Sequence, residues 1–338
     1  MNPSCISSFT YYDSPQFLQL SLRLLTILST PIYILGVYCI VAKTPTVMKS
    51  VKWYLLTLQM FIVTGEYTFA WFCVPYILFP SFGGISYGLF SDLGIPVSIQ
   101  VVFCMGLIAY GFICNAAIFE NRFFILCDFA GKVYWEKFRR GWLLLHIVGV
   151  WICCGPVFMF IPDQETAKEE MFQKLPCLPD YIYNGPVFVL RVDTTYHLTM
   201  EIVMLPIFCG EVGFFIYKLI KNIHDQQTNL KVSQKTIQLH KQFLTALILQ
   251  ISIPLVLGVF PIAQFCFNTL FEYFNQAVTN FTCVIATNYG LASTVVMIVV
   301  HKPYRAAVKD MYHRMAKRTV LSSSVRTKIS VVVVSNAF

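Results

Sequence analysis

The chain has 338 residues, of which 57% are hydrophobic and 12% are charged, whereas about 25% of the residues in soluble domains are charged. A soluble fold would have to hide nearly all of that apolar matter, but a membrane protein exposes apolar side chains to lipid. The composition therefore excludes an ordinary soluble domain. In a membrane protein the basic residues behind the net charge of +8 mark the cytoplasmic side of the bilayer. We therefore expect no nucleic-acid partner.

Seven apolar runs follow one another along the chain, each close to the ~20 residues that cross a bilayer as a helix. The leader before the first run has no Lys or Arg, so that run is predicted to be a transmembrane helix and not a signal peptide. We expect an all-α membrane protein with an N-terminal segment (1–19), a seven-transmembrane helix bundle (20–301) and a tail (302–338). The predicted spans are 20–42, 53–79, 95–119, 141–162, 197–220, 243–265 and 278–301.

The basic residues predict how the bundle is oriented. Most of the 25 Lys and Arg residues lie in the first, third and fifth connections and in the tail. Basic residues in short loops remain on the cytoplasmic side of a membrane. We therefore expect an extracellular N-terminus and a cytoplasmic C-terminus.

Acidic residues within predicted spans are costly and often functional. Glu66 lies about 14 residues beyond Lys52, or roughly 21 Å above the inner face, where it could contact a ligand or bond another helix. Glu201 lies near the outer end of the fifth span, where interfacial solvation explains it equally well. Glu211 lies deeper and is a possible partner of Arg122 or of another helix.

The third predicted span ends in Glu120-Asn121-Arg122-Phe123. An arginine at the inner end of a helix can simply extend its charge to the lipid headgroups. Alternatively, a neighbouring helix holds Arg122 at rest and releases it on activation, which opens a surface for a partner. We favour the second interpretation and predict an activation switch at Glu120, Asn121 and Arg122.

The sixth predicted span contains Pro254 and Pro261 on one face. Because each proline removes a backbone hydrogen bond and can kink a helix, we predict a hinge there. After the seventh span, apolar side chains recur at helical spacing among basic ones, at positions 308, 311, 312 and 315. This pattern predicts a short amphipathic cytoplasmic helix on the inner leaflet.

Cys177 lies in the long fourth connection, which is predicted to face an oxidising space. Cys5 is its predicted disulfide partner, and Cys104 and Cys266 are the alternatives. The sequence contains no His or Cys pairs at metal-ligand spacing and no phosphate-binding loop. We therefore expect no enzyme activity, no catalytic residue, no metal and no cofactor.

The most distinctive stretches of the chain are Tyr12–Leu18, Gly36–Ile40 with Lys43–Pro45, Met48–Trp53, Glu120–Phe123 and His301–Arg305. Together they resemble the nematode chemosensory seven-helix receptors, most closely the serpentine receptor class H group (Srh) of the Str superfamily. The resemblance implies a G protein-coupled receptor in the plasma membrane of sensory neuron cilia, with an olfactory role in sensory transduction. It adds Pro303, Tyr304 and Arg305 to the predicted G protein-coupling residues.

The chain departs from rhodopsin-type receptors at two of these places. Asn121 separates the acid from the arginine, and Pro303 and Tyr304 are adjacent. The activation contacts of rhodopsin-type receptors therefore do not transfer to this chain one by one.

We expect a small, odorant-like molecule to bind between the helices in an apolar pocket, and a heterotrimeric G protein to dock on the cytoplasmic face. The alternative is a polytopic transporter or a ligand-gated channel, although internal repeats and paired midplane charges are not seen. An insect-type channel would place the N-terminus inside. The predicted pocket residues are Glu66, Tyr67, Met105, Ile108, Gln250, Gln264 and Asn288.

Overall fold

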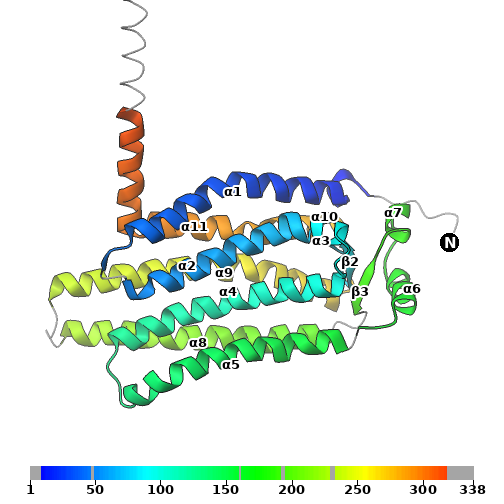
Figure 1. Cartoon of the computed structure of the whole chain (residues 1–338). Coiled ribbons are helices and arrows are strands. Elements are labelled where there is room, and N and C mark those ends of the chain that lie inside the picture. The colour runs from blue at the N-terminus through cyan, green and yellow to red at the C-terminus, as the bar shows by residue number, and fades with distance from the viewer. Residues whose placement is uncertain (1–8, 47–48, 160, 192–194, 229–232, 318–338) are drawn as a thin grey trace, which may run out of the picture.

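The computed structural model describes residues 9–46, 49–159, 161–191, 195–228 and 233–317. Long helices run side by side in one elongated bundle (Figure 1). With α10 and α11 taken as one broken rod, the described residues form the seven rods that the sequence predicts. They are α1 (Pro15–Lys43), α2 (Lys49–Tyr67), α4 (Val97–Leu126), α5 (Lys132–Met159), α8 (Thr195–Thr228), α9 (Gln234–Leu270), α10 (Gln276–Thr287) and α11 (Tyr289–Val300).

Five helical segments in the described part of the chain are long and apolar enough to cross a membrane. The rods α2 and α5 fall at the predicted second and fourth spans, and α2 has Lys49, Lys52 and Glu66 among its 19 residues. The five segments are Pro15–Lys43, Val97–Leu126, Ile202–Thr228, Thr236–Leu270 and Gln276–Val300.

The second rod is shorter than the sequence predicts. After a π-helical turn (Thr68–Phe72) the helix stops, so the last residues of the predicted span 53–79 are not helical. Val74 has a positive φ of 40°, and Pro75 has no N–H with which to continue a helix. The chain leaves the bundle here as strand β1 (Pro75–Ile77).

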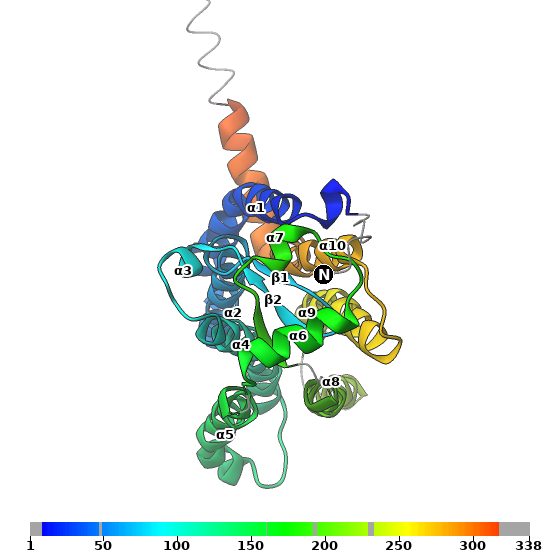
Figure 2. The same cartoon turned by 90° about the vertical axis from the view of Figure 1, so that its right-hand side faces the viewer.

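Three strands and two short helices form a cap on one end of the bundle, which we call the lid. Strand β2 (Phe82–Ser86) pairs antiparallel with β1 on one side and with β3 (Phe188–Arg191) on the other. Helices α6 (Gln164–Lys174) and α7 (Asp180–Tyr183) pack with this sheet (Figure 2). The short α3 (Leu89–Asp92) joins the lid to α4. The lid shares a buried core with the start of α1 through Leu18 and Leu22. The lid residues in this core include Tyr76, Leu78, Met171, Ile182 and Val189.

The N-terminal segment is bonded to the lid and to α10. A 3₁₀ turn (Tyr11–Asp13) precedes α1, and an Asp13 side-chain oxygen accepts a hydrogen bond of 2.8 Å from the backbone N–H of Ala277. The Tyr76 hydroxyl donates to the backbone oxygen of Asp13 at 2.6 Å. Burial, followed by the neighbouring Tyr181, raises the pKa of Tyr76, so this hydroxyl stays a donor at neutral pH.

The opposite end of the bundle, which we call the Arg122 end, contains the end of the third predicted span. Helix α4 continues to Leu126, past the predicted boundary at 119, and α5 begins at Lys132. Residues 302–317 form a further helix, drawn in orange to red, which turns across the bundle axis (Figure 1). It lies where the amphipathic helix is predicted, and Tyr312 and Met315 on it are exposed.

Candidate functional site

The last turns of α4 bring Glu120, Asn121 and Arg122 into the centre of the Arg122 end. Successive residues of a helix point about 100° apart, so three consecutive side chains reach different neighbours. All three residues are buried, with exposed fractions of 2%, 5% and 5%. The headgroup interpretation of Arg122 requires an exposed guanidinium, and the structure shows a buried one.

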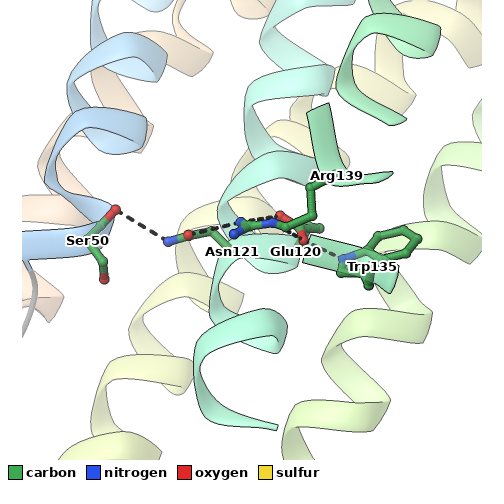
Figure 3. A network of polar contacts seen from close by, with 5 residues as sticks. All are labelled: Ser50, Glu120, Asn121, Trp135 and Arg139. Carbon is green, nitrogen blue, oxygen red and sulfur yellow. Dashed lines mark hydrogen bonds and ion pairs between the residues drawn. The ribbon is translucent and has the colours of Figure 1, made fainter. Parts of the chain in front are cut away.

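Two residues of α5 donate hydrogen bonds to the Glu120 carboxylate. Its carboxylate accepts two hydrogen bonds of 2.8 Å from Arg139, one from Nε and one from Nη2. The indole Nε1 of Trp135 donates to Glu120 Oε1 at 2.7 Å (Figure 3). A two-pronged arginine–carboxylate pair is stronger and more directional than a single contact. The pair therefore fixes α5 to α4.

Asn121 extends this network to α2. Its Oδ1 accepts from Arg139 Nη2 at 3.2 Å, and its Nδ2 donates to the backbone oxygen of Ser50 at 3.4 Å (Figure 3). An aspartate at this position could not donate to Ser50. The asparagine between the acid and the arginine thus joins α2, α4 and α5.

Arg122 points to α9 instead. Its guanidinium carbon lies 3.9 Å from the centre of the Phe243 ring, within the range of a cation–π interaction. Its Nε and Nη2 are buried and form no hydrogen bond within the described part of the chain. The ring nitrogens His240 Nδ1 and His301 Nε2 are likewise buried without a partner among the described residues. Arg122 is therefore held mainly by an aromatic ring.

The segment after α11 closes this site from the side of α1. Tyr304 is fully buried, and its hydroxyl is 2.8 Å from the Thr44 hydroxyl at the end of α1. The rings of Tyr304 and Phe243 lie 5.3 Å and 5.5 Å from the ring of His301. Burial raises the pKa of the Tyr304 phenol. Arg305 is exposed and donates from Nη1 to the backbone oxygen of Val299 at 3.1 Å.

The sequence offers two kinds of partner for Glu211, namely Arg122 or a residue of another helix. In the structure Glu211 forms hydrogen bonds with α5 and not with Arg122. Trp142 Nε1 donates to its Oε1 at 2.8 Å, and His146 Nε2 lies 3.0 Å from its Oε2. This second polar contact joins α8 to α5. The side chain of Glu201 lies outside the described residues.

The predicted pocket residues lie at several places in the bundle. Glu66 accepts a hydrogen bond from the Tyr33 hydroxyl on α1, and the Tyr67 hydroxyl is 2.8 Å from that of Thr30. Both therefore make contacts between helices. Met105 packs beneath β3 beside Val102 and Leu190, whereas Ile108 is 51% exposed.

The remaining three predicted pocket residues involve α9 and the broken rod. Gln250 is buried, and its Oε1 has no partner among the described residues. Gln264 bonds the hydroxyls of Thr279 and Thr282 on α10. Asn288, at the break between α10 and α11, donates from Nδ2 to the backbone oxygen of Val284 at 2.6 Å. Asn288 also lines a groove of about 530 Å³ between α9 and the broken rod.

The predicted hinge falls within α9, which is helical through both proline positions. The side chain of Pro254 lies outside the described residues. Cys177 is disulfide-bonded, and the structure leaves Cys104 and Cys266 out of that bond. The predicted partner Cys5 lies outside the described residues, so the Cys5–Cys177 pairing stays a prediction.

Sequence reasoning missed the partners that give the site its geometry. In the sequence, Arg139 is one of several basic residues in the third connection, and nothing nearby marks Trp135 or Phe243. Only their fold-dependent proximity to Glu120 and Arg122 marks them. A long gap in sequence separates Phe243 from Arg122, so no local motif includes both.

A bundle of seven helical rods, five of which contain segments that are long and apolar enough to cross a membrane, is the architecture expected of a serpentine receptor. The chain belongs to the family described as serpentine type 7TM GPCR chemoreceptor Srh, whose model matches residues 13–314. It is similar to serpentine receptor class H-72 of Caenorhabditis elegans, with 23% identity over 313 residues that cover 91% of this chain and 88% of the relative. The predicted family and the predicted seven-helix fold are confirmed, and the family is one of receptors.

Proposed function

We propose that this protein detects a small environmental molecule and signals through a heterotrimeric G protein. The extracellular end is then the lid end, and the Arg122 end faces the cytoplasm, as the distribution of basic residues favours. Plasma membrane of sensory neuron cilia is the proposed location. The family supports the proposal, because the match covers nearly the whole chain.

The observation that carries the proposal is the contact between Arg122 and Phe243. A desolvated cation–π contact contributes about 2 kcal/mol or more, which corresponds to a factor of roughly 30 in a two-state equilibrium. A ligand that displaces the Arg122 end of α9 would have to outweigh that contact together with the packing of α9 against α8 and the broken rod. Arg122 would then be free to bind an acceptor on the G protein, because two of its buried nitrogens have no partner in the described part of the chain.

The Glu120–Arg139 pair has a different proposed role. It holds α5 and, through Asn121, α2 against α4, so the frame stays in place while α9 moves. Pro254 and Pro261 are the proposed hinge of that movement. Pro303 and Arg305 border the same end and are proposed to contact the G protein, and the buried Tyr304 is proposed to hold their segment in place through Thr44.

The ligand site is proposed to lie between α4, α9 and the broken rod. Glu66 and Tyr67 already bond to α1, so their proposed role is to shape the wall rather than to bind the ligand directly. Gln250 offers a buried side-chain oxygen without a partner among the described residues. Gln264 and Asn288 complete the proposed set, whereas Met105, which packs beneath β3, and Ile108, which is exposed, are not part of it.

Expression in a reporter cell, with an epitope tag at the N-terminus, tests this proposal. A panel of odorants should evoke a G protein-dependent signal, and the tag should be accessible on unpermeabilised cells. A tag that is accessible only after permeabilisation would contradict the orientation. An odorant-evoked current that persists with G proteins blocked would favour the channel alternative.

A further inference from the structure

The lid occupies the end of the bundle from which a water-borne ligand would approach. Its buried core includes Tyr76, Leu78 and Ile182, each with an exposed fraction of 0%. Gln276 Nε2 at the start of α10 donates to the backbone oxygen of Ile77 at 3.1 Å, so the lid is bonded to the helices beneath it. The lid lies across the bundle end between α2 and α10 (Figure 2). A ligand that entered the bundle along its axis from this end would therefore have to unpack the folded core of the lid.

The groove between α9 and the broken rod offers a route from the side. It has a volume of about 530 Å³, which falls within the usual range of small-molecule sites. Its walls are aliphatic except at Asn288. The lining residues are Leu257, Ile285, Asn288, Leu291, Ala292, Val295 and Val296.

The lining residues lie on more than one face of the broken rod. The Tyr289 hydroxyl would lie 3.8 Å from a Cβ at Gly111 on α4, so Tyr289 faces the bundle interior. Val296 is about two helical turns further on and shares that face, whereas Val295 is 39% exposed and points outward. Because both line the groove, the groove passes beside the rod from its inner face to its outer face.

Two contacts between α9 and the rest of the chain lie on either side of the groove. Nearer the lid, Gln264 of α9 bonds Thr279 and Thr282 of α10. At the Arg122 end, Phe243 of α9 packs against His301 with ring centres 5.5 Å apart. Leu257 lies between these two positions on α9, at the level of the helix break. The groove thus lies between two points at which α9 is held in place.

We propose that this groove is a lateral binding site for a small apolar molecule that reaches the receptor through the bilayer. The proposal rests on the proposed receptor function and names the chemical class of its ligand. Aliphatic walls favour a molecule that partitions into lipid. Asn288 supplies one amide, which suits a ligand with a single hydroxyl or carbonyl group.

Photolabelling of the full-length receptor in phosphatidylcholine vesicles tests the proposal. The probe is a short aliphatic diazirine bearing a terminal alkyne, and labelled residues are located by mass spectrometry. Label should concentrate at the groove, above the level at the exposed residues Leu28 and Ile34 of α1. Equal labelling of the groove and of α1 would overturn the proposal.

A matched pair of variants on α11 makes the test specific. Val295→Trp fills the groove, whereas Val299→Trp adds the same ring one turn further on, at an exposed position outside the lining. Groove labelling should fall roughly tenfold in Val295→Trp and stay unchanged in Val299→Trp. Ala292→Leu, a smaller change, should reduce it partly if Val295→Trp fails to fold. Labelling that is indifferent to Val295→Trp and Ala292→Leu would overturn the proposal.

The alternative occupant is a phospholipid acyl chain. A phosphatidylcholine with the diazirine on its acyl chain should label the groove less than the free probe does, and equal labelling would overturn the small-molecule assignment. Labelling needs no G protein. A failure of the proposed receptor function would therefore appear as absent G protein activation with groove labelling intact, whereas a failure of this inference would appear in the labelling itself.

Discussion

Arg139 donates two hydrogen bonds of 2.8 Å to the Glu120 carboxylate across the α4–α5 interface. The exposed fraction of the Glu120 side chain is 3% and that of Arg139 is 21%, so each charge depends on the other for solvation. Removing one partner of a buried pair leaves the other charge uncompensated, which costs about 3–5 kcal/mol.

Glu120→Gln should therefore lower the free energy of unfolding by about 3 kcal/mol, towards the low end because Arg139 reaches some solvent. The double variant Glu120→Gln/Arg139→Gln should lose less than the sum of the two single variants. Thermal unfolding of the purified receptor in detergent measures both. Glu136→Gln, an exposed acid on α5, is the control, and strictly additive losses would contradict a coupled pair.

Phe243→Ala should raise signalling in the absence of ligand. Removing the ring under Arg122 loses about 2 kcal/mol that holds α9 to α4, so basal activity should increase severalfold. A reporter assay of untreated cells measures this, with Phe260→Ala as the control because Phe260 is an exposed ring on the same helix. Unchanged basal activity in Phe243→Ala, at equal surface expression, would contradict the proposed restraint.

The lid should depend on a glycine in its middle strand. A Cβ at Gly84 would lie 2.1 Å from the backbone oxygen of Tyr76, so Gly84→Ala should force β1 and β2 apart and cost about 1–3 kcal/mol. Gly65→Ala, on α2 with open space around the position, is the control. Surface expression and thermal unfolding are the measurements, and equal behaviour of the two variants would contradict the lid packing.

Cys177→Ser should destabilise the lid by about 2–4 kcal/mol, because Cys177 is disulfide-bonded. If Cys5 is the partner, then Cys5→Ser and the double variant should each match Cys177→Ser. Non-reducing peptide mapping and thermal unfolding check this pairing. A Cys5→Ser receptor that unfolds like the wild type would assign the bond elsewhere.

The bundle could be predicted from the sequence because an apolar run is a local property, and the charge bias is a sum over local loops. The lid could not. Its strand β2 contains Gly83 and Gly84, which are poor strand formers, and Gly83 pairs with Val189 far along the chain. The end of the second rod and the break at Asn288 could not be predicted either, because both lie within continuous apolar runs.

The candidate site was predictable in part. Glu120, Asn121 and Arg122 stand out in the sequence as polar residues, two of them charged, at the end of an apolar run, but their partners do not. Arg139 looked like any basic loop residue, and its two bonds to Glu120 arise from the return of α5 alongside α4. The choice of Phe243 over Glu211 as the neighbour of Arg122 depends on helix packing, which no local pattern encodes.

The most direct test is the ligand-evoked activation of a G protein by Arg122→Ala, measured beside Arg140→Ala. Arg140 is an exposed arginine at the same end of the bundle, so its replacement removes the same charge without disturbing the contact with Phe243. The account predicts that Arg122→Ala reaches the cell surface but no longer signals, whereas Arg140→Ala signals normally. Undiminished signalling by Arg122→Ala at equal surface expression would contradict it.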